Sequence, residues 1–155
     1  MKKTLSACLL SFAATLPFAA GAADLVARFE NGIGVQPLRA GGLPNTVHGV
    51  NPGGFPWVIS RLSASVGSDG KIQVDGRGLL LAGGDNIGTT GGQSVRARLF
   101  CAAVPFDSDL VALDPRGDFS IGGFVNPLPP SPCTDPALLI VNANGAWFAA
   151  GIPRQ

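Results

Sequence analysis

His48 is the one histidine of this chain, and therefore the one imidazole that could act as the general base of a hydrolytic site. It lies in a segment rich in glycine, proline and asparagine, and the sequence has no G-x-S-x-G motif to supply an activated serine. Asp75 and Asp85 could meet at one end of a sheet as a catalytic acid pair, but most aspartates stand beside turn residues and serve the backbone there. These patterns favour a non-catalytic protein, and the alternative is a small secreted hydrolase that uses His48 or an aspartate pair.

A second group of acidic residues raises the question of metal binding. The run Asp107-Ser108-Asp109 sets two carboxylates near Asp114 and Asp118, and Ca²⁺ prefers several such oxygens. The spacing matches no EF-hand loop, so a solvated acidic loop is the simpler interpretation. One histidine and two distant cysteines make a poor zinc set. We therefore predict no metal and no cofactor.

The tripeptide Arg116-Gly117-Asp118 has the spelling that integrins recognise, with a guanidinium and a carboxylate presented by one turn. The same residues, following a proline, are also typical of an ordinary turn that leads into a strand. Both interpretations stay open at this point, and the turn is the simpler one.

The N-terminus has the pattern of a cleaved export signal. Lys2 and Lys3 form a positive region, and residues 5–20 carry no charge and are broken by Pro17. Small residues at the end of this stretch suit signal peptidase, and cleavage after Ala23 leaves residues 24–155 as one domain. We predict a secreted or periplasmic protein with no stable membrane insertion once the signal, residues 1–23, is removed.

Cysteine usage agrees with export. Cys8 lies inside the predicted signal, where residues 5–8 resemble a lipobox, but the apolar run follows that cysteine instead of preceding it. Cys101 and Cys133 remain after cleavage as an even pair in an oxidising compartment. We predict a disulfide between them.

The charge balance restricts the class of partner. A formal net charge of +1 over the whole chain gives no electrostatic case for nucleic acid or for an anionic membrane surface, since both require a clustered basic face. The expected partner is an extracellular or cell-envelope ligand, either a protein or a glycan.

Strand patterns dominate the rest of the chain, because 22 glycines and 13 prolines interrupt it too often for long helices. Residues 57–66 alternate, with Val58 and Leu62 on the apolar face, and a Ser-Asp-Gly turn joins them to residues 71–75 in a predicted hairpin. Asn144-Gly145 predicts a second hairpin with a type I′ turn. Further strands are predicted at residues 25–29, 33–38, 79–81, 94–101, 110–113, 118–121, 137–142 and 146–152.

About eight to nine short strands with hairpin turns are typical of an all-β fold. We predict an antiparallel β-sandwich, Ig-like or transthyretin-like, with a β-barrel as the alternative. Residues 111–121 follow the pattern V-x-L-x-x-x-G-x-F-x-I, and a cysteine follows at position 133. This stretch resembles transthyretin-like and carboxypeptidase-regulatory-like sandwiches, in which such a turn starts a strand. The resemblance implies a sandwich and assigns no functional residue.

Two glycine-rich loops are the candidate binding surface. Residues 40–56 carry or adjoin His48, Phe55 and Trp57, and residues 83–92 form a second such loop. Loops held on a rigid β scaffold are where folds of this class place recognition residues. We expect His48, Phe55 and Trp57 to contact the ligand. The alternative is that the loops are long connections whose aromatic side chains pack into the core.

Overall fold

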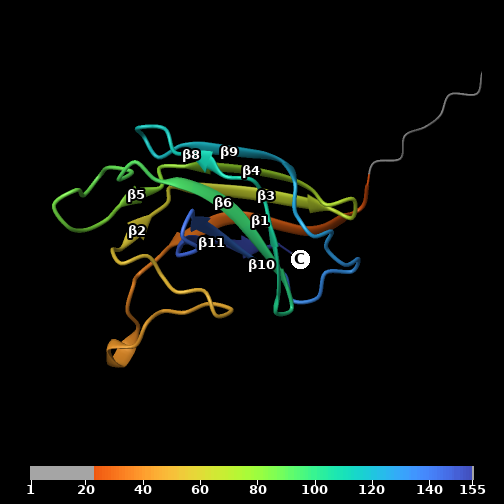
Figure 1. The fold of residues 1–155 in the computed structure, drawn as a ribbon, viewed down its shortest axis with the longest axis horizontal. Helices are drawn as coiled ribbons and strands as arrows, with labels where there is room; N and C mark the ends of the chain where they lie inside the picture. The colour runs from red at the N-terminus through yellow and green to blue at the C-terminus, as the bar shows by residue number, and fades with distance from the viewer. Residues whose placement is uncertain (1–22, 155) are drawn as a thin grey trace, which may run out of the picture.

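Figure 1 shows the computed structural model, which describes residues 23–154. Nearly all of the predicted signal therefore lies outside the described residues. The regular structure of the described part is antiparallel β, with one 3₁₀ turn, η1 (Ala40–Gly42), and no helix long and apolar enough to cross a membrane. The strands are β1 (Leu25–Gly34), β2 (Trp57–Val58), β3 (Arg61–Gly67), β4 (Lys71–Arg77), β5 (Leu80–Leu81), β6 (Ser94–Cys101), β7 (Val104–Asp107), β8 (Val111–Ala112), β9 (Phe119–Phe124), β10 (Ala137–Asn142) and β11 (Trp147–Pro153).

Nine of these strands form one curled sheet. Its order is β7-β6-β10-β11-β1-β3-β4-β9, with β8 also paired to β6, while β2 and β5 form a separate two-stranded sheet. The two ends of the long sheet touch where Asp107, at the end of β7, and Asn126, just beyond β9, exchange backbone hydrogen bonds of 3.1 and 2.9 Å. The predicted all-β, antiparallel architecture is confirmed.

The core fills the inside of the curl, and its pattern follows from period-two alternation. In β3 the side chains of Leu62, Ala64 and Val66 are buried, and in β4 those of Ile72 and Val74 are buried, while their neighbours in sequence are polar. The two strands pair in register across the Ser-Asp-Gly turn, as the predicted hairpin requires. The outer face of β1, β3 and β4 is consequently a polar surface.

The prediction of one strand over residues 57–66 is wrong. The chain turns at Ile59-Ser60, so that β2 pairs with β5 while β3 pairs with β1 and β4. The break resets the alternation, and Val58, predicted to face inward with Leu62, is 48% exposed. The sequence did not reveal this break, because Val58 and Leu62 are an even number of positions apart, as they would be on one face of an unbroken strand.

The second predicted hairpin, β10–β11, is confirmed, but the type of its turn is not. In a type I′ turn both central residues have positive φ, whereas only Gly145 does so here, at +84°. The Gly145 N–H donates to the Asn142 carbonyl at 3.0 Å, which is the pattern of a type I turn followed by a left-handed glycine. The predicted disulfide is present, with an S–S distance of 2.02 Å, and it ties the end of β6 to the segment before β10.

Candidate binding site

The loop between β1 and β2, residues 35–56, runs beside the start of β11, where the backbone of Trp147 is hydrogen-bonded to Asn51 and Gly53. The central residues of β10 are at most 1% exposed, although Leu139 and Val141 lie in register with the outward-facing arginines of β6. The Trp147 indole Nε1–H also donates to the carbonyl oxygen of Asn45, at 2.8 Å. These contacts anchor the loop on the sheet, although most of its residues are exposed.

His48 lies at the tip of a small hairpin inside this loop. Val47 and Val50 exchange two backbone hydrogen bonds, and the two residues between them, His48 and Gly49, have φ of +46° and +78°. Positive φ at both central positions is the requirement of a type I′ turn. The imidazole stacks on the Phe100 ring with the ring centroids 4.7 Å apart, and it makes no side-chain hydrogen bond to any residue within 23–154. The ring of His48 therefore packs the loop against β6.

Trp57 stands elsewhere, at the start of β2. It is 3% exposed and stacks on Phe148, with ring centroids 4.0 Å apart and an angle of 13° between the planes. Glycine is required beneath this pair, because a Cβ at Gly53 would lie 2.7 Å from the Phe148 ring, and a Cβ at Gly34 would lie 2.0 Å from the Trp57 carbonyl oxygen. Trp57 therefore forms the floor of a surface region and offers little area of its own.

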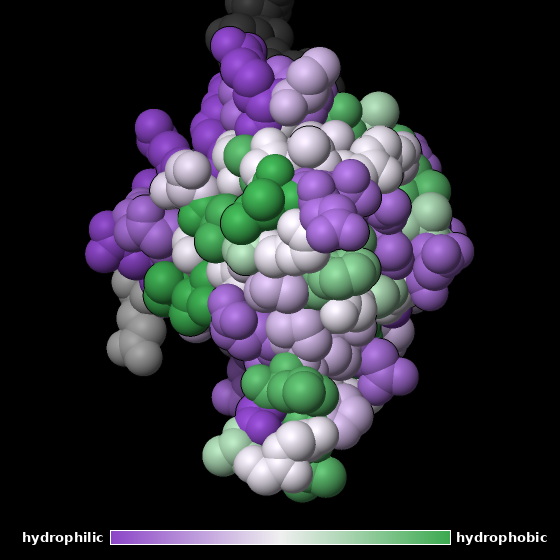
Figure 2. All heavy atoms as spheres, turned by 90° about the vertical axis from the view of Figure 1, so that its left-hand side faces the viewer, coloured by the Kyte–Doolittle hydropathy of each residue, from purple (hydrophilic) through white to green (hydrophobic). Residues whose placement is uncertain are grey.

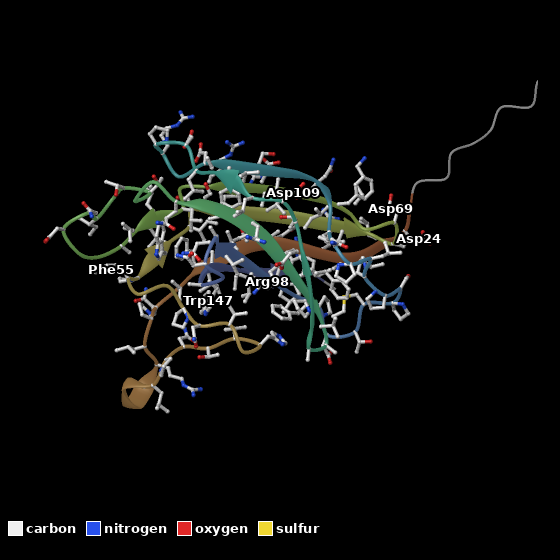
Figure 3. The ribbon with its side chains drawn as sticks, viewed as in Figure 1. Asp24, Phe55, Asp69, Arg98, Asp109 and Trp147 are labelled. Atoms are coloured by element: carbon white, nitrogen blue, oxygen red, sulfur yellow. A yellow bond between two sulfur atoms is a disulfide. The ribbon has the colours of Figure 1, made fainter. Side chains whose placement is uncertain are left out.

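Phe55 is exposed, as His48 is, but it lies elsewhere on the surface. It is 56% exposed and lies beside the second loop, where a Cβ at Gly84 would come within 3.0 Å of its ring. Figure 3 places it at one end of the molecule, opposite the end that carries Asp24 and Asp69. The structure thus brings Phe55 and Trp57 to one region and leaves His48 against β6, outside it.

Two neighbouring hollows share Gly53 and Gly54 in their linings, and Phe55 lines the smaller of them. The first has a volume of about 240 Å³ and is lined by Phe55 and Trp57 together with the amide side chains of Gln93 and Asn142. The second, of about 630 Å³, extends along the first loop. Its further lining residues are Gln36, Pro37, Leu38, Pro44, Asn51 and Pro52. We call the two together the loop-end groove, and no acidic or basic side chain of the described chain lines it.

Asn142 and Gln93 are site residues that the sequence did not reveal. The Asn142 Oδ1 accepts hydrogen bonds from the backbone N–H groups of Asn144 and Ala146, at 3.1 and 2.9 Å, and so closes the β10–β11 turn. Its Nδ2 donates to Gln93 Oε1 at 3.4 Å, and both residues line the smaller hollow. Nothing in the pattern could mark these amides, because 49 residues separate them along the chain.

Figure 2 shows this end of the molecule, with apolar side chains in separate clusters among polar ones. Besides Phe55, the large apolar side chains exposed around the loops include Leu38, Leu43, Val58 and Ile87, each at least 48% exposed. The surface around the groove therefore has separate apolar areas with polar groups between them, and it is not one continuous apolar patch.

Asp107, Asp114 and Asp118 are used inside the fold. Asp107 accepts two hydrogen bonds from the Arg98 guanidinium, at 2.7 and 2.6 Å, and this contact raises the pKa of Arg98. The Asp118 N–H donates to the Asp114 carboxylate at 2.8 Å, and this backbone hydrogen bond lowers the pKa of Asp114. No group of three or more potential metal-ligating side chains lies together within residues 23–154.

The Arg-Gly-Asp tripeptide forms the turn before β9. The Asp118 carboxylate accepts from the Gly78 N–H at 3.0 Å and faces the Arg77 guanidinium at 3.4 Å, so it is held within the fold. Gly117 has φ of +79°, as the turn requires. These contacts favour the turn interpretation over adhesion.

Comparison of this chain with family models, with curated proteins and with solved structures finds no match.

Proposed function

We propose that this protein is an exported, non-catalytic binding module whose loop-end groove binds a neutral glycan of the cell envelope or the extracellular space. The observation that carries the proposal is an uncharged groove with an exposed aromatic ring, Phe55, beside side-chain amides. Loops on a rigid β scaffold are a common place for such sites.

The chemistry of the groove suits a sugar ring. A pyranose has a face of C–H groups and a rim of hydroxyls, so it needs an apolar surface flanked by neutral donors and acceptors. The Phe55 ring supplies the surface, while Gln93, Asn142 and the backbone at Gly53-Gly54 supply polar groups. The absence of charged side chains among the described lining residues favours a neutral ligand over an acidic or basic one.

Export and scaffold belong to the same proposal. The signal at residues 1–23 would deliver the chain to an oxidising compartment, where the Cys101–Cys133 bond is stable. Of the two scaffolds considered, sandwich and barrel, we favour the barrel, and the Asp107–Asn126 bridge between the sheet's two ends supports it. The hydrolase alternative gains no support from the contacts of His48, whose ring stacks on Phe100.

The test measures retention of the protein on insoluble cellulose, chitin and peptidoglycan and its affinity for their soluble oligosaccharides. Phe55→Ala should weaken binding about 2- to 10-fold, because an aromatic contact of this kind contributes about 0.5–1.5 kcal/mol. Ile87→Ala is the matched control, since Ile87 is 65% exposed on the neighbouring loop and does not line the groove.

An equal loss in Ile87→Ala would indicate unspecific apolar adhesion and would refute the groove. Binding to envelope material that protease treatment removes would identify a protein partner and would refute the glycan. Absence of binding to every polysaccharide tested would also count against the proposal.

A further inference from the structure

A second surface, on the polar face of the sheet, has the character of a binding site. It is a trough of about 480 Å³ over β1, β3 and β4. Charged side chains line it, whereas the loop-end groove has none among the described residues. Arg28 and Glu30 form its wall on β1, and Ser63 and Ser65 of β3 lie opposite them in register. Arg61 lines the trough farther along β3.

A bulge in β1 shapes this trough. The register of β1 against β11 shifts between Phe29 and Gly32, and Asn31 between them has φ of +65°. Bulges bend a strand and redirect its side chains, and they are frequent next to binding sites. Asn31 itself lines the trough.

The carboxylates of the trough already have arginine partners from outside it. Glu30 accepts a hydrogen bond from the Arg154 Nε–H at 2.6 Å, and this contact lowers the pKa of Glu30. Glu30 also pairs with Arg28 at 3.0 Å, and Asp75 pairs with Arg77 at 3.3 Å. Both acids of the trough are therefore paired, Glu30 with two arginines and Asp75 with one.

Arg61 is the unsatisfied member of this group. No carboxylate within residues 23–154 lies at ion-pair distance from it. Its cross-strand partner is Arg77, and like charges placed directly opposite each other destabilise a sheet. Arg77 turns toward Asp75 and Asp118, at 3.3 and 3.4 Å. Arg61 itself is exposed, so its guanidinium is open to a bound anion.

We propose that this trough binds a small ligand that carries an oxyanion: a carboxylate, a sulfate or a phosphate. The guanidinium of Arg61 pairs with the oxyanion, since its planar fork of N–H donors matches two oxygens of such a group. The hydroxyls of Ser63 and Ser65 bind neutral groups of the ligand, and Arg28 limits the far end of the trough. The volume suits a ligand of about one to two sugar rings.

The test is an NMR titration of the ¹⁵N-labelled protein, expressed from the full 155-residue chain. Glucuronate, glucose 6-sulfate and glucose 6-phosphate are the anionic probes, and glucose is the neutral one. Saturable shifts of the Ser63 and Ser65 amides are expected with at least one anionic probe and not with glucose. Shifts from glucose near Gly53-Gly54 would report the loop-end groove instead, so the two sites are read separately.

Arg61→Gln should raise the dissociation constant for the anionic probe about tenfold, as expected when a charge-assisted hydrogen bond is lost. Arg61→Lys should recover only part of the affinity, because lysine keeps the charge but not the fork. Arg39→Gln is the matched control, since it removes the same charge from an exposed loop position outside the trough. An equal effect of Arg39→Gln, equal shifts of the two serine amides by glucose, or no saturable shift up to about 10 mM of each anion would overturn the proposal.

Discussion

His48 offers the sharpest test of how the long loop is held, because substitutions can separate its backbone role from its ring. His48→Phe keeps an aromatic ring over Phe100. His48→Asn keeps a residue that tolerates positive φ but removes the ring, and His48→Val removes the ring and places a β-branched residue at a φ of +46°.

The expected magnitudes follow from these two contributions. An aromatic pair contributes about 0.5–1.5 kcal/mol beyond the area it buries, so His48→Asn should favour opening of the loop by about 2- to 10-fold. The left-handed conformation costs an ordinary residue about 1–2 kcal/mol, so His48→Phe, which keeps the ring, should favour opening by about 5- to 30-fold. His48→Val has the same backbone cost and also loses the ring, so it should favour opening by at least roughly 10-fold and by more than His48→Phe does.

Hydrogen exchange of the Trp147 indole is the appropriate assay. Its Nε1–H donates to the carbonyl of Asn45, so it is protected only while residues 35–56 lie on the sheet. The exchange rate, followed by NMR at fixed pH and temperature, then reports the opening equilibrium in each variant, and the amides of β4 in the same spectra show whether the sheet itself is intact.

The reasoning would be refuted if His48→Phe accelerated indole exchange as much as His48→Val, because the stacked ring would then have no part in holding the loop. It would equally be refuted if His48→Val and His48→Asn gave the same rate, since the turn conformation would then impose no constraint. Greater acceleration by His48→Val than by either His48→Phe or His48→Asn would establish His48 as a packing and turn residue.

Two further predictions concern stability. Gly117→Ala should lower the free energy of unfolding by at least about 2 kcal/mol in urea denaturation, because φ is +79° and the new Cβ would lie 2.5 Å from the Leu79 carbonyl oxygen. The control is Gly122→Ala, where a Cβ meets nothing within 4 Å, and it should change the free energy of unfolding by under about 0.5 kcal/mol. Equal losses in the two variants would contradict the argument. The hydrogen bond from Arg154 holds the pKa of Glu30 below its ordinary value of 4.5, so this contact stabilises the fold above that pH and is lost as the pH falls through the lowered value. The free energy of unfolding of Arg154→Gln should therefore fall less steeply below about pH 4.5 than that of the unmodified protein. The same pH dependence in both proteins would show that the contact contributes nothing.

The sequence predicted those elements whose signals are local. The alternation in β3 and β4 and the Ser-Asp-Gly turn between them needed only neighbouring residues, and the structure has both. β7 (Val104–Asp107) was missed, because its Val-Pro-Phe-Asp sequence has a proline in place of a clear alternation and pairs with β6 through a two-residue connection. The order of strands in the curled sheet depends on long-range pairing, such as β1 with β11, which no local pattern records.

Part of the candidate site could likewise be predicted from the sequence and part could not. Phe55 was predicted as a contact residue and remains exposed, while Trp57, chosen on the same grounds, is buried against Phe148. Residue type alone could not separate them, because the difference arises from Gly34 and Gly53, which let the backbone approach Trp57 and Phe148 closely. The lack of a carboxylate partner for Arg61 among the described residues was also hidden, since it depends on which neighbours pair with which acids.

The location of the two proposed sites follows from how the strands are connected. At the end of the molecule near Asp24, β3 and β4 are joined by a short turn, and the Ser68 N–H donates to the Asp24 carbonyl at 2.7 Å (Figure 3). The connection from β9 to β10 packs against this turn, where the Val125 N–H donates to the Gly70 carbonyl at 2.9 Å. At the opposite end the connections are long, and their glycines create hollows instead of tight packing. A neutral ligand therefore belongs at the loop end, where backbone and amide groups are open. A charged ligand belongs on the polar face, where register alone sets Arg61 opposite another arginine.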